Sequence, residues 1–242
     1  MRDEDLPRFN PRPVLQAVAI GDGQQALVVD DVLLNPEALV DLAARHPQAL
    51  QRPRGYAFPG REWWMPPDFA SRLDDFFRQH VRGRLGGRRT VDMSCRLSMV
   101  NFAPQELAPH QWQCHRDLQG LQPGRIILAS VLYLFQDPAL GGTSFFRPRR
   151  SHDETVAMLQ DALRLDGPAF TRARSVQPGY IQGSNAWFEH TATLPARFNR
   201  MVFYNGTVFH AGDIQHPERL GSDARTGRLT LNGFFACTPQ AS

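Results

Sequence analysis

The second half of the chain consists of short apolar runs separated by turn-forming residues. From about residue 89 onward, stretches rich in Val, Ile, Leu, Phe and Thr alternate with Gly, Pro, Asn and Asp. The runs occupy residues 96–103, 110–117, 125–135, 141–147, 200–212 and 227–236. Many short strands with frequent turn signals are typical of a β-sandwich or jelly roll. This pattern therefore predicts a mainly β fold with flanking helices.

The region before residue 89 is expected to form an N-terminal arm and supporting helices. Asn35, Pro36 and Glu37 make a typical helix start with the asparagine as N-cap, and apolar residues follow at helical spacing. A second helix is predicted from Pro67 to about Arg82. The other expected segments are an irregular arm at 1–24, a strand at 25–33 and an aromatic, proline-rich loop at 55–67.

A chain of 242 residues, of which 42% are hydrophobic, suits one domain over residues 1–242. We expect the supporting elements at 1–88 and the β core at 89–236. One segment, 148–199, interrupts the strand pattern and is interpreted as an insertion with a helix near 151–165. Both a lid over a site and a packing element fit this composition.

Composition argues against several classes of function. The net charge is +3 and the arginines are mostly scattered, so a nucleic-acid partner is not expected. The longest apolar run, 126–135, is too short to cross a bilayer, so no membrane segment is expected. The three cysteines form no C-x-x-C pair and no signal peptide is evident, which favours a cytoplasmic protein. A homodimer is compatible with these features.

The first candidate for chemistry is the pair His115 and Asp117 in the motif HRD. A lone His-x-Asp often arises by chance, so its context must carry the interpretation. If the segment QWQCHRD is extended, then Gln113, His115 and Asp117 share one face and Cys114 points away. Such a strand end presents two of the three ligands of the facial triad of two histidines and one carboxylate, which binds non-haem Fe(II).

A third ligand is available in His210, which ends an apolar strand. Taken alone, a histidine in this position is more often a core residue with satisfied hydrogen bonds than a metal ligand. His110 and His216 lie in polar, loop-like segments, so they are weaker candidates.

The segment GRLTL adds a candidate anion site. Arg228 and Thr230 lie two residues apart in an apolar strand, so they face the same way. An arginine that faces a sheet interior is costly unless it pairs with an anion, and its guanidinium suits a carboxylate. The alternative is an edge strand on which Arg228 faces solvent. The order His-x-Asp, distant His and then Arg-x-Thr makes coincidence much less probable.

With these motifs in place, the chain resembles the Fe(II)/2-oxoglutarate-dependent dioxygenases, in particular the prolyl 4-hydroxylase-like branch and, within it, an uncharacterised bacterial group. The resemblance covers about residues 26–236 and is poor in 148–199. It rests on the segments ALVVDDVLLNPEALVDLA, HRD, VLYLFQDPALGGTSFF, NRMVFYNGTVFHAGDI and GRLTLNGFF.

The resemblance implies a double-stranded β-helix, a cupin-like jelly roll, and an enzyme that uses Fe(II), 2-oxoglutarate and molecular oxygen. It places iron on His115, Asp117 and His210, and the distal carboxylate of 2-oxoglutarate on Arg228 and Thr230. It further implies decarboxylation to succinate coupled to hydroxylation of an amino-acid, peptidyl or other small polar substrate.

Four features of this sequence bear on that resemblance. Arg228 follows His210 by 18 residues, a longer spacing than is common in the family, with Arg225 as a rival in the intervening loop. Asn199 stands where a glycine often precedes the distal strand. Asp117 disfavours halogenation, because related halogenases carry a small residue there. Phe234 replaces the second arginine of the nucleic-acid demethylases.

Further site residues are proposed with a packing role as the alternative. Asn101 and Tyr133 are candidates for co-substrate contacts. The candidates for substrate contacts are Gln113, Trp187, Tyr180 and Trp64. From a different class of function, a non-catalytic cupin-like module that binds a metal or another ligand is the competing interpretation.

Overall fold

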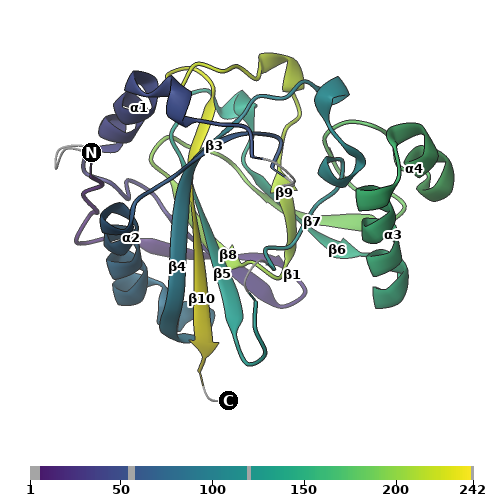
Figure 1. The fold of residues 1–242 in the computed structure, drawn as a ribbon. Helices are drawn as coiled ribbons and strands as arrows, with labels where there is room; N and C mark the ends of the chain where they lie inside the picture. Colours follow the sequence, from purple (N-terminus) through teal and green to yellow (C-terminus); the bar gives the residue numbers. More distant parts are fainter. Residues whose placement is uncertain (1–5, 54–57, 119–120, 241–242) are drawn as a thin grey trace.

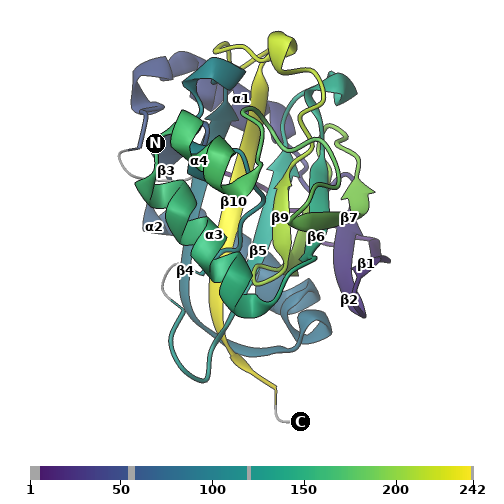
Figure 2. The same ribbon diagram turned by 90° about the vertical axis from the view of Figure 1, so that its right-hand side faces the viewer.

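The computed structural model describes residues 6–53, 58–118 and 121–240, and it contains two antiparallel sheets that face each other (Figures 1 and 2). The large sheet has the order β1 (Leu15–Gly21), β2 (Gln24–Val29), β8 (Met201–Asn205), β5 (Ile126–Tyr133), β10 (Arg228–Pro239), β4 (Gly87–Val100) and β3 (Gly60–Trp64). The small sheet has the order β7 (Phe188–Leu194), β6 (Thr143–Pro148) and β9 (Phe209–Gly212). The expected mainly β architecture is confirmed.

Four α-helices accompany the sheets: α1 (Pro36–Arg45), α2 (Pro67–His80), α3 (His152–Arg164) and α4 (Gly167–Arg174). Short 3-10 turns complete the described elements: η2 (Pro47–Ala49), η3 (Arg82–Leu85), η4 (Pro104–Glu106), η5 (Pro109–Gln111), η6 (Pro138–Leu140) and η7 (Pro217–Arg219). Figure 2 shows α3 and α4 beside the small sheet, whereas α1 and α2 lie on the other side of the molecule in Figure 1. No helix in the described ranges is long and apolar enough to cross a membrane.

Side chains that alternate along β10 give the two faces of the large sheet different environments. Leu229, Leu231 and Phe235 are fully buried in the core under α1 and α2, where Phe235 stacks on Phe77 at a ring-centroid distance of 3.8 Å. The alternating residues Arg228, Thr230, Asn232 and Phe234 face the interior between the two sheets. One strand thus closes the apolar core and presents polar groups to a cavity.

Two further apolar clusters hold the small sheet in place. Phe145 on β6 and Tyr204 on β8 pack together between the sheets, with their ring centroids 5.2 Å apart. On the other side of the small sheet, Met158 and Phe170 from α3 and α4 pack with Phe188 and Phe209. The segment around α3 and α4 therefore braces the strand that carries His210.

Several expected elements differ from the structure. The arm at 1–24 contains β1, and the loop expected at 55–67 contains β3, with residues 54–57 outside the described part. The segment expected as an insertion, 148–199, contains α4 and also β7, so its last part belongs to the small sheet. These strands were missed because their own apolar patterns are weak: β1 is defined by its hairpin with β2, whereas β3 and β7 pair with β4 and β6, which lie further away in the sequence.

Asn35 occupies the predicted N-cap position of α1, but its side chain makes no cap hydrogen bond. Its carboxamide oxygen instead accepts a hydrogen bond from the Arg8 backbone N–H at 2.8 Å, and its nitrogen donates to the Leu6 carbonyl. The N-terminal arm therefore uses the cap residue for its own attachment. The predicted N-cap position of Asn35 is confirmed, although its side chain bonds to the arm instead of the helix.

Candidate functional site

His115, Asp117 and His210 are brought together by backbone pairing between two distant segments. The His115 N–H donates to the His210 carbonyl and the His210 N–H donates to the His115 carbonyl, both at 2.9 Å. The Asp117 N–H donates to the Gly206 carbonyl at 2.7 Å. A Cβ on Gly206 would lie 3.0 Å from the Asp117 Cβ, so glycine allows this close approach. The backbone thus fixes the three side chains relative to one another.

The segment around His115 is not the extended strand that its alternation predicted. Residues Pro109–Gln111 form a 3-10 turn, and His115 makes only an isolated bridge to His210. The predicted orientations nevertheless hold, because Gln113, His115 and Asp117 line the cavity while Cys114 is buried in the apolar cluster beside α3.

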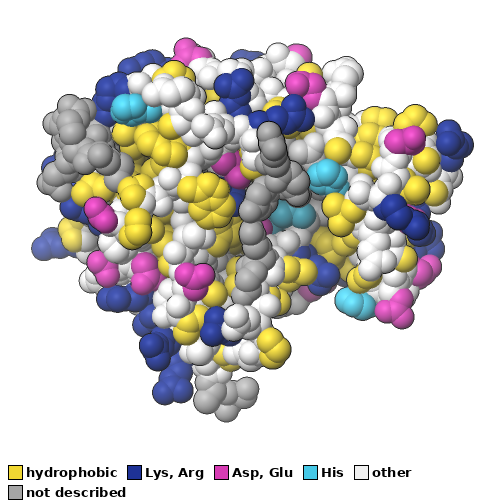
Figure 3. All heavy atoms as spheres, in the orientation of Figure 1, with side chains coloured by type: hydrophobic (Ala, Val, Ile, Leu, Met, Phe, Trp, Pro, Cys, Tyr) yellow, Lys and Arg dark blue, Asp and Glu magenta, His cyan; other side chains and the backbone are white. Residues whose placement is uncertain are grey.

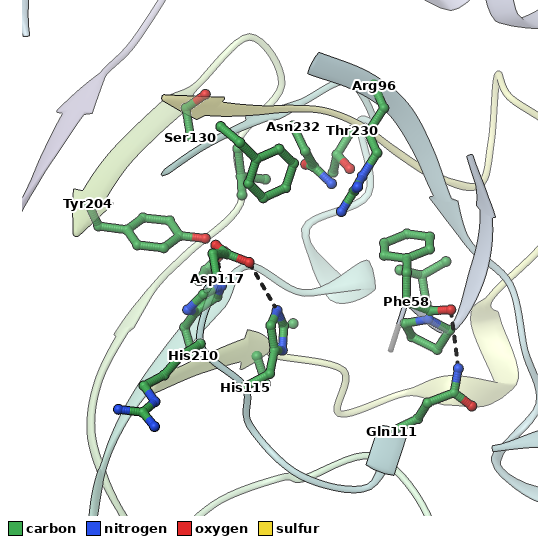
Figure 4. A pocket seen from close by; sticks show the side chains of 18 of the residues that line it. Phe58, Arg96, Gln111, His115, Asp117, Ser130, Tyr204, His210, Thr230 and Asn232 are labelled. Atoms are coloured by element: carbon green, nitrogen blue, oxygen red, sulfur yellow. Dashed lines mark hydrogen bonds and ion pairs between the residues drawn. The ribbon is translucent and has the colours of Figure 1, made fainter. Parts of the chain in front are cut away.

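The three side chains offer two nitrogens and one oxygen within 4.8 Å of one another. His210 Nε2 lies 3.3 Å from Asp117 Oδ2, and His115 Nε2 lies 3.8 Å from Asp117 Oδ1 (Figure 4). His210 Nδ1 lies 2.9 Å from the Val208 carbonyl, to which it can only donate. That hydrogen bond selects the tautomer with a free lone pair on Nε2, the form that binds a metal.

The electrostatics of the cluster favour an ionised carboxylate. Burial raises the pKa of Asp117, but the neighbouring His210, His115 and Arg96 together lower it below its usual value. Desolvation and the neighbouring His210 lower the pKa of His115, which keeps this imidazole neutral. Burial lowers the pKa of His210, but Asp117 outweighs that effect and raises it. Metal ligation needs the deprotonated form of all three groups, which the lowered pKa values of Asp117 and His115 favour and the raised pKa of His210 opposes.

Arg228 is held by backbone carbonyls and not by a carboxylate. Its Nε donates to the Leu140 and Gly141 carbonyls at 2.9 and 3.2 Å, and its Nη2 donates to the Gly142 carbonyl at 2.8 Å. Gly141 has a φ of 86°, and a Cβ there would lie 1.8 Å from the Asp213 carbonyl oxygen, so only glycine forms this cradle. Within the described ranges, no acidic side chain comes within ion-pair distance of Arg228, which is 5% exposed.

The predicted choice between the two arginines agrees with the structure. Arg225 lies on the surface and pairs with Asp41, with 2.6 Å between Nη1 and Oδ1. Arg228 instead lines the cavity, next to the buried Thr230. The Thr230 hydroxyl donates to the Ser98 carbonyl in a long contact of 3.4 Å.

A cavity of about 430 Å³ contains the triad and Arg228. Figure 3 shows histidine side chains in the hollow between the part that carries β4 and β10 and the part that carries α3 and α4. Gln113 lines the cavity and is 4% exposed, yet neither its oxygen nor its nitrogen has a hydrogen-bond partner in the described part of the chain. The Asn232 carboxamide oxygen is also buried there without a partner. Unpaired buried amides are costly, so they indicate a cavity that takes a polar ligand.

Other expected site residues are divided between the cavity and the packing around it. Tyr180 and Trp64 line the cavity, and the Tyr180 hydroxyl donates to the Phe102 carbonyl at 2.8 Å. Trp187 does not line it: this side chain packs in the cluster beside α3, and its indole N–H donates to the Arg174 carbonyl. The expected substrate contact by Trp187 therefore has no support in the structure.

The two expected co-substrate contacts outside β10 lie behind the cavity wall. Asn101 donates from Nδ2 to the Ser222 hydroxyl at 2.7 Å and is not among the lining residues. Tyr133 is fully buried, pairs with Thr230 across the strands, and its hydroxyl lies 2.8 Å from that of Thr143. Thr143 does line the cavity. Tyr133 therefore positions a lining residue, and neither expected contact is direct.

Tyr204 and Arg96 are among the lining residues that were not expected from the sequence. Tyr204 points its hydroxyl toward Asp117 (Figure 4), and Arg96 on β4 extends into the cavity from the large sheet. The signal for Arg96 is present in the sequence: Arg96 and Ser98 alternate with Leu97 and Met99, as Arg228 and Thr230 alternate with Leu229 and Leu231.

Comparison with solved structures finds distant neighbours. HygX from Streptomyces hygroscopicus, solved with nickel and 2-oxoglutarate bound, is 13% identical, covers 90% of this chain and 84% of its own, and gives a TM-score of 0.46. The non-haem α-ketoglutarate-dependent carbocyclase SnoK of nogalamycin biosynthesis is 13% identical, with coverage of 88% and 79% and a TM-score of 0.47. An N-substituted L-amino acid dioxygenase from Burkholderia ambifaria AMMD is 13% identical, with coverage of 86% and 80% and a TM-score of 0.36.

These similarities are too distant to carry a functional conclusion, which must come from the chain's own residues. No curated protein matches the sequence. The family model of DUF6445, a family of unknown function, matches residues 11–235. The chain therefore belongs to the DUF6445 family.

Proposed function

We propose that this protein is a non-haem Fe(II)- and 2-oxoglutarate-dependent oxygenase of the double-stranded β-helix, or jelly-roll, class. It would hydroxylate an amino-acid, peptidyl or other small polar substrate and convert 2-oxoglutarate to succinate. The observation that carries the proposal is the shared cavity, which joins a cluster of two histidines and one carboxylate to a buried arginine that has no carboxylate partner among the described residues.

The donor set fits Fe(II). Two imidazole nitrogens and one carboxylate oxygen form the ligand set of mononuclear Fe(II) oxygenases, which leave the remaining positions open for other ligands. Asp117 Oδ2 is buried and has no partner with hydrogen-bond geometry within the described residues, as is expected of an oxygen that serves as a metal ligand. The Val208 carbonyl orients the His210 ring from behind.

The surroundings of Arg228 fit the distal carboxylate of 2-oxoglutarate. Burial lowers the pKa of Arg228, but an arginine remains charged in a protein, so this cation needs an anion. The carbonyls of Leu140 and Gly142 fix the guanidinium without neutralising it. An incoming carboxylate can then form charge-assisted hydrogen bonds with the remaining N–H groups.

When bound, Fe(II) with 2-oxoglutarate and molecular oxygen would supply the oxidising chemistry, in which one oxygen atom enters succinate as carbon dioxide is released and the other enters the hydroxylated substrate. The chain's own residues hold the metal, orient the co-substrate and shape the cavity. Asp117 stays ionised because of its neighbours, Arg228 orients the co-substrate, and the apolar residues around the cavity limit the access of water. The unpaired amide of Gln113 is available to orient a polar group of either substrate.

The proposal is tested by anaerobic reconstitution with Fe(II), followed by addition of 2-oxoglutarate and oxygen. We expect succinate to form, slowly without a second substrate. Asp117→Ala should abolish both succinate formation and metal binding, since it removes one of three ligands. His216→Ala is the matched control, because His216 lies at the surface beside Glu218.

Two results would contradict the proposal. One is the absence of succinate with every candidate substrate although the protein binds Fe(II). The other is an unchanged metal affinity in Asp117→Ala. Binding of a metal without any binding of 2-oxoglutarate would favour the non-catalytic module instead.

A further inference from the structure

Arg96 is a second cavity arginine that the iron and 2-oxoglutarate sites do not use. It lies on the inner face of β4, directly opposite Asn232 of β10, and lines the cavity. Its guanidinium lies over two aromatic rings, 4.5 Å from the ring centroid of Phe234 and 5.1 Å from that of Trp64. Figure 4 shows the side chain extending toward the open space between Phe58 and the triad.

The strand register separates Arg96 from Arg228. Arg228 pairs with Val100 on β4, and Arg96 lies four residues before Val100 on the same strand. At about 3.3 Å per residue, the two arginines are offset by roughly 13 Å along the sheet. The two arginines therefore join the cavity wall at different places along the sheet. Besides Arg228 and Arg96, Arg116 also lines the cavity, with its guanidinium 4.7 Å from the ring centroid of Phe209.

Glu62 fixes Arg96 from behind. Its Oε1 lies 2.7 Å from Arg96 Nε, and the Glu62 side chain is only 2% exposed. Glu62 does not line the cavity, and it is the one carboxylate within ion-pair distance of Arg96 in the described part of the chain. This contact is an ion pair without hydrogen-bond geometry. With Glu62 beside Nε and aromatic rings against the guanidinium faces, the edge formed by the two Nη atoms is the side that can meet a ligand. Such an edge matches a carboxylate, which it binds through two parallel hydrogen bonds.

We propose that Arg96 binds a carboxylate group of the molecule that is oxidised, and that this molecule carries an apolar or aromatic body next to that group. The inference rests on the proposed function and names the substrate class of the same cavity. The rings of Phe58, Trp64 and Phe234 surround the Arg96 end and supply the apolar surface for the body. Arg96 is already paired with Glu62, and Asp92 lies further along β4, so the small local positive charge suits a carboxylate better than a phosphate dianion.

Calorimetry on protein loaded with Zn(II) and 2-oxoglutarate tests the inference without turnover. The probes are benzoate, phenylacetate and N-benzoylglycine, each compared with its primary amide, together with phenyl phosphate. We expect at least one acid to bind about tenfold or more tightly than its amide, the size of effect expected for a charge-assisted hydrogen-bond pair. Binding of Zn(II) and 2-oxoglutarate is measured first, so failure of the proposed function is recognised separately.

Variants identify the residue responsible. Arg96→Gln should remove the preference for acids over amides, and its loss of acid affinity should exceed any change in 2-oxoglutarate affinity. Arg96→Lys should retain part of the preference, since it keeps the charge and loses the planar fork. Glu62→Gln keeps an acceptor for Arg96 Nε and removes a competing anion, so its acid affinity should equal or exceed that of the wild type. Arg61→Gln, exposed on the same strand as Glu62, is the control and should change nothing.

The outcomes that overturn the inference are distinct. The first is that acids and amides bind equally well. The second is that no acid binds to protein that does bind Zn(II) and 2-oxoglutarate. The third is that the preference for acids survives in Arg96→Gln. Tighter binding of phenyl phosphate than of every acid would also overturn it, because it would assign the position to a phosphate.

Discussion

Among the site residues, Arg228 has the surroundings that most restrict its possible function. Three backbone carbonyls hold it, and no carboxylate in the described part of the chain pairs with this buried cation. We predict that Arg228→Gln weakens 2-oxoglutarate binding by about 10-fold to 100-fold, because one charge-assisted pair is lost. Arg228→Lys should be intermediate, since lysine offers a point charge without the planar fork. Calorimetric titration of Zn(II)-loaded protein measures both affinities.

Arg225→Gln is the matched control for this prediction, because Arg225 is exposed and pairs with Asp41. Zn(II) affinity and the thermal unfolding of each variant should be recorded alongside. Loss of Zn(II) binding together with 2-oxoglutarate binding in Arg228→Gln would mean that Arg228 supports the metal site, and the assignment would then be wrong.

Asn199 gives a prediction about a turn that the sequence marked as unusual. Its φ is 61°, in the left-handed region, and its side chain accepts from the Leu33 N–H and donates to the Leu33 carbonyl. Asparagine tolerates this conformation better than most residues. Asn199→Gly keeps the left-handed backbone conformation and loses only the two hydrogen bonds. Asn199→Ala loses the two hydrogen bonds and also the residue's tolerance of the left-handed conformation. We expect losses in the free energy of unfolding of about 1–3 and 2–4 kcal/mol, respectively.

Chemical denaturation of the two Asn199 variants measures this order. An alanine variant as stable as the glycine variant would show that the left-handed backbone carries no cost here. Glycine, the residue more common at this position in the resembled family, supplies the conformation alone. Asparagine adds a link to the segment that follows β2, which explains why a non-glycine residue fits.

At the residue scale, sequence predicted the triad and Arg228 but misplaced their neighbours. The side to which a residue points in an extended segment depends only on local alternation. The orientations of His115, Asp117 and Arg228 could therefore be predicted. Asn101 was proposed because it lies on a predicted core strand near the site. Trp187 was proposed because it lies in an irregular aromatic segment beside the predicted β core. Their side chains are directed by Ser222 and by the Arg174 carbonyl, which no local pattern reveals.

At the scale of elements, the end of the β2–β8 ladder is closed by ionic contacts. Asp30 follows β2 and Arg200 precedes β8, with 2.6 Å between Arg200 Nε and Asp30 Oδ1, while Arg197 Nη1 lies 3.1 Å from Asp30 Oδ2. The hydrogen bond and charge of Arg200 outweigh burial and hold the pKa of Asp30 below 3.8, its ordinary value. This cluster therefore ties the end of β2 to the start of β8, the strand that precedes β9 with His210.

We predict that Asp30→Asn lowers the free energy of unfolding at neutral pH by about 0.5–1 kcal/mol, a small effect because a third of the Asp30 side chain is exposed. A carboxylate with a lowered folded-state pKa contributes stability above its unfolded-state pKa and loses it as the pH falls through the folded-state value. The difference between wild type and variant should therefore be constant above about pH 5 and shrink below about pH 4. Denaturant titrations across this range measure it. A difference that grows toward acid would reverse the sign and contradict the assignment.

Sequence predicted the elements with strong internal patterns and missed those that depend on partners. Helix α2 and strand β5 carry clear helical spacing and a continuous apolar run, and both lie where they were expected. The edge strands β1 and β3 have mostly exposed or mixed faces, so only their pairing with β2 and β4 defines them. The segment before His115 alternates like a strand, but it bridges β9 at a single residue.

At the scale of the whole molecule, the triad, Arg228 and Arg96 come from strands on both sheets and from the segment that contains His115, and all of them face one cavity. Sequence could order these residues along the chain but could not show that they share one space. Their convergence means that ligands in the cavity hold the two sheets together. Binding should therefore stabilise the fold as a unit, and the two ligands should act in order.

We predict that Zn(II) or Mn(II) alone raises the unfolding temperature, that 2-oxoglutarate alone does not, and that the pair raises it most. A ligand at 100 times its Kd adds about 2.7 kcal/mol to the free energy of unfolding, and a domain of this size gains roughly 2–4 °C per kcal/mol. The metal should be needed first, because it supplies the binding point for the oxo acid. Differential scanning fluorimetry with each ligand and with both measures this order.

The variants give each step its own signature. Asp117→Ala should lose both shifts, Arg228→Gln should keep the metal shift and lose the additional shift from 2-oxoglutarate, and Arg225→Gln should keep both. If 2-oxoglutarate stabilised the metal-free protein as strongly as the metal-loaded protein, the two sites would be independent. The shared cavity would then not be one catalytic centre, because two ligands that meet in one centre must each strengthen the binding of the other.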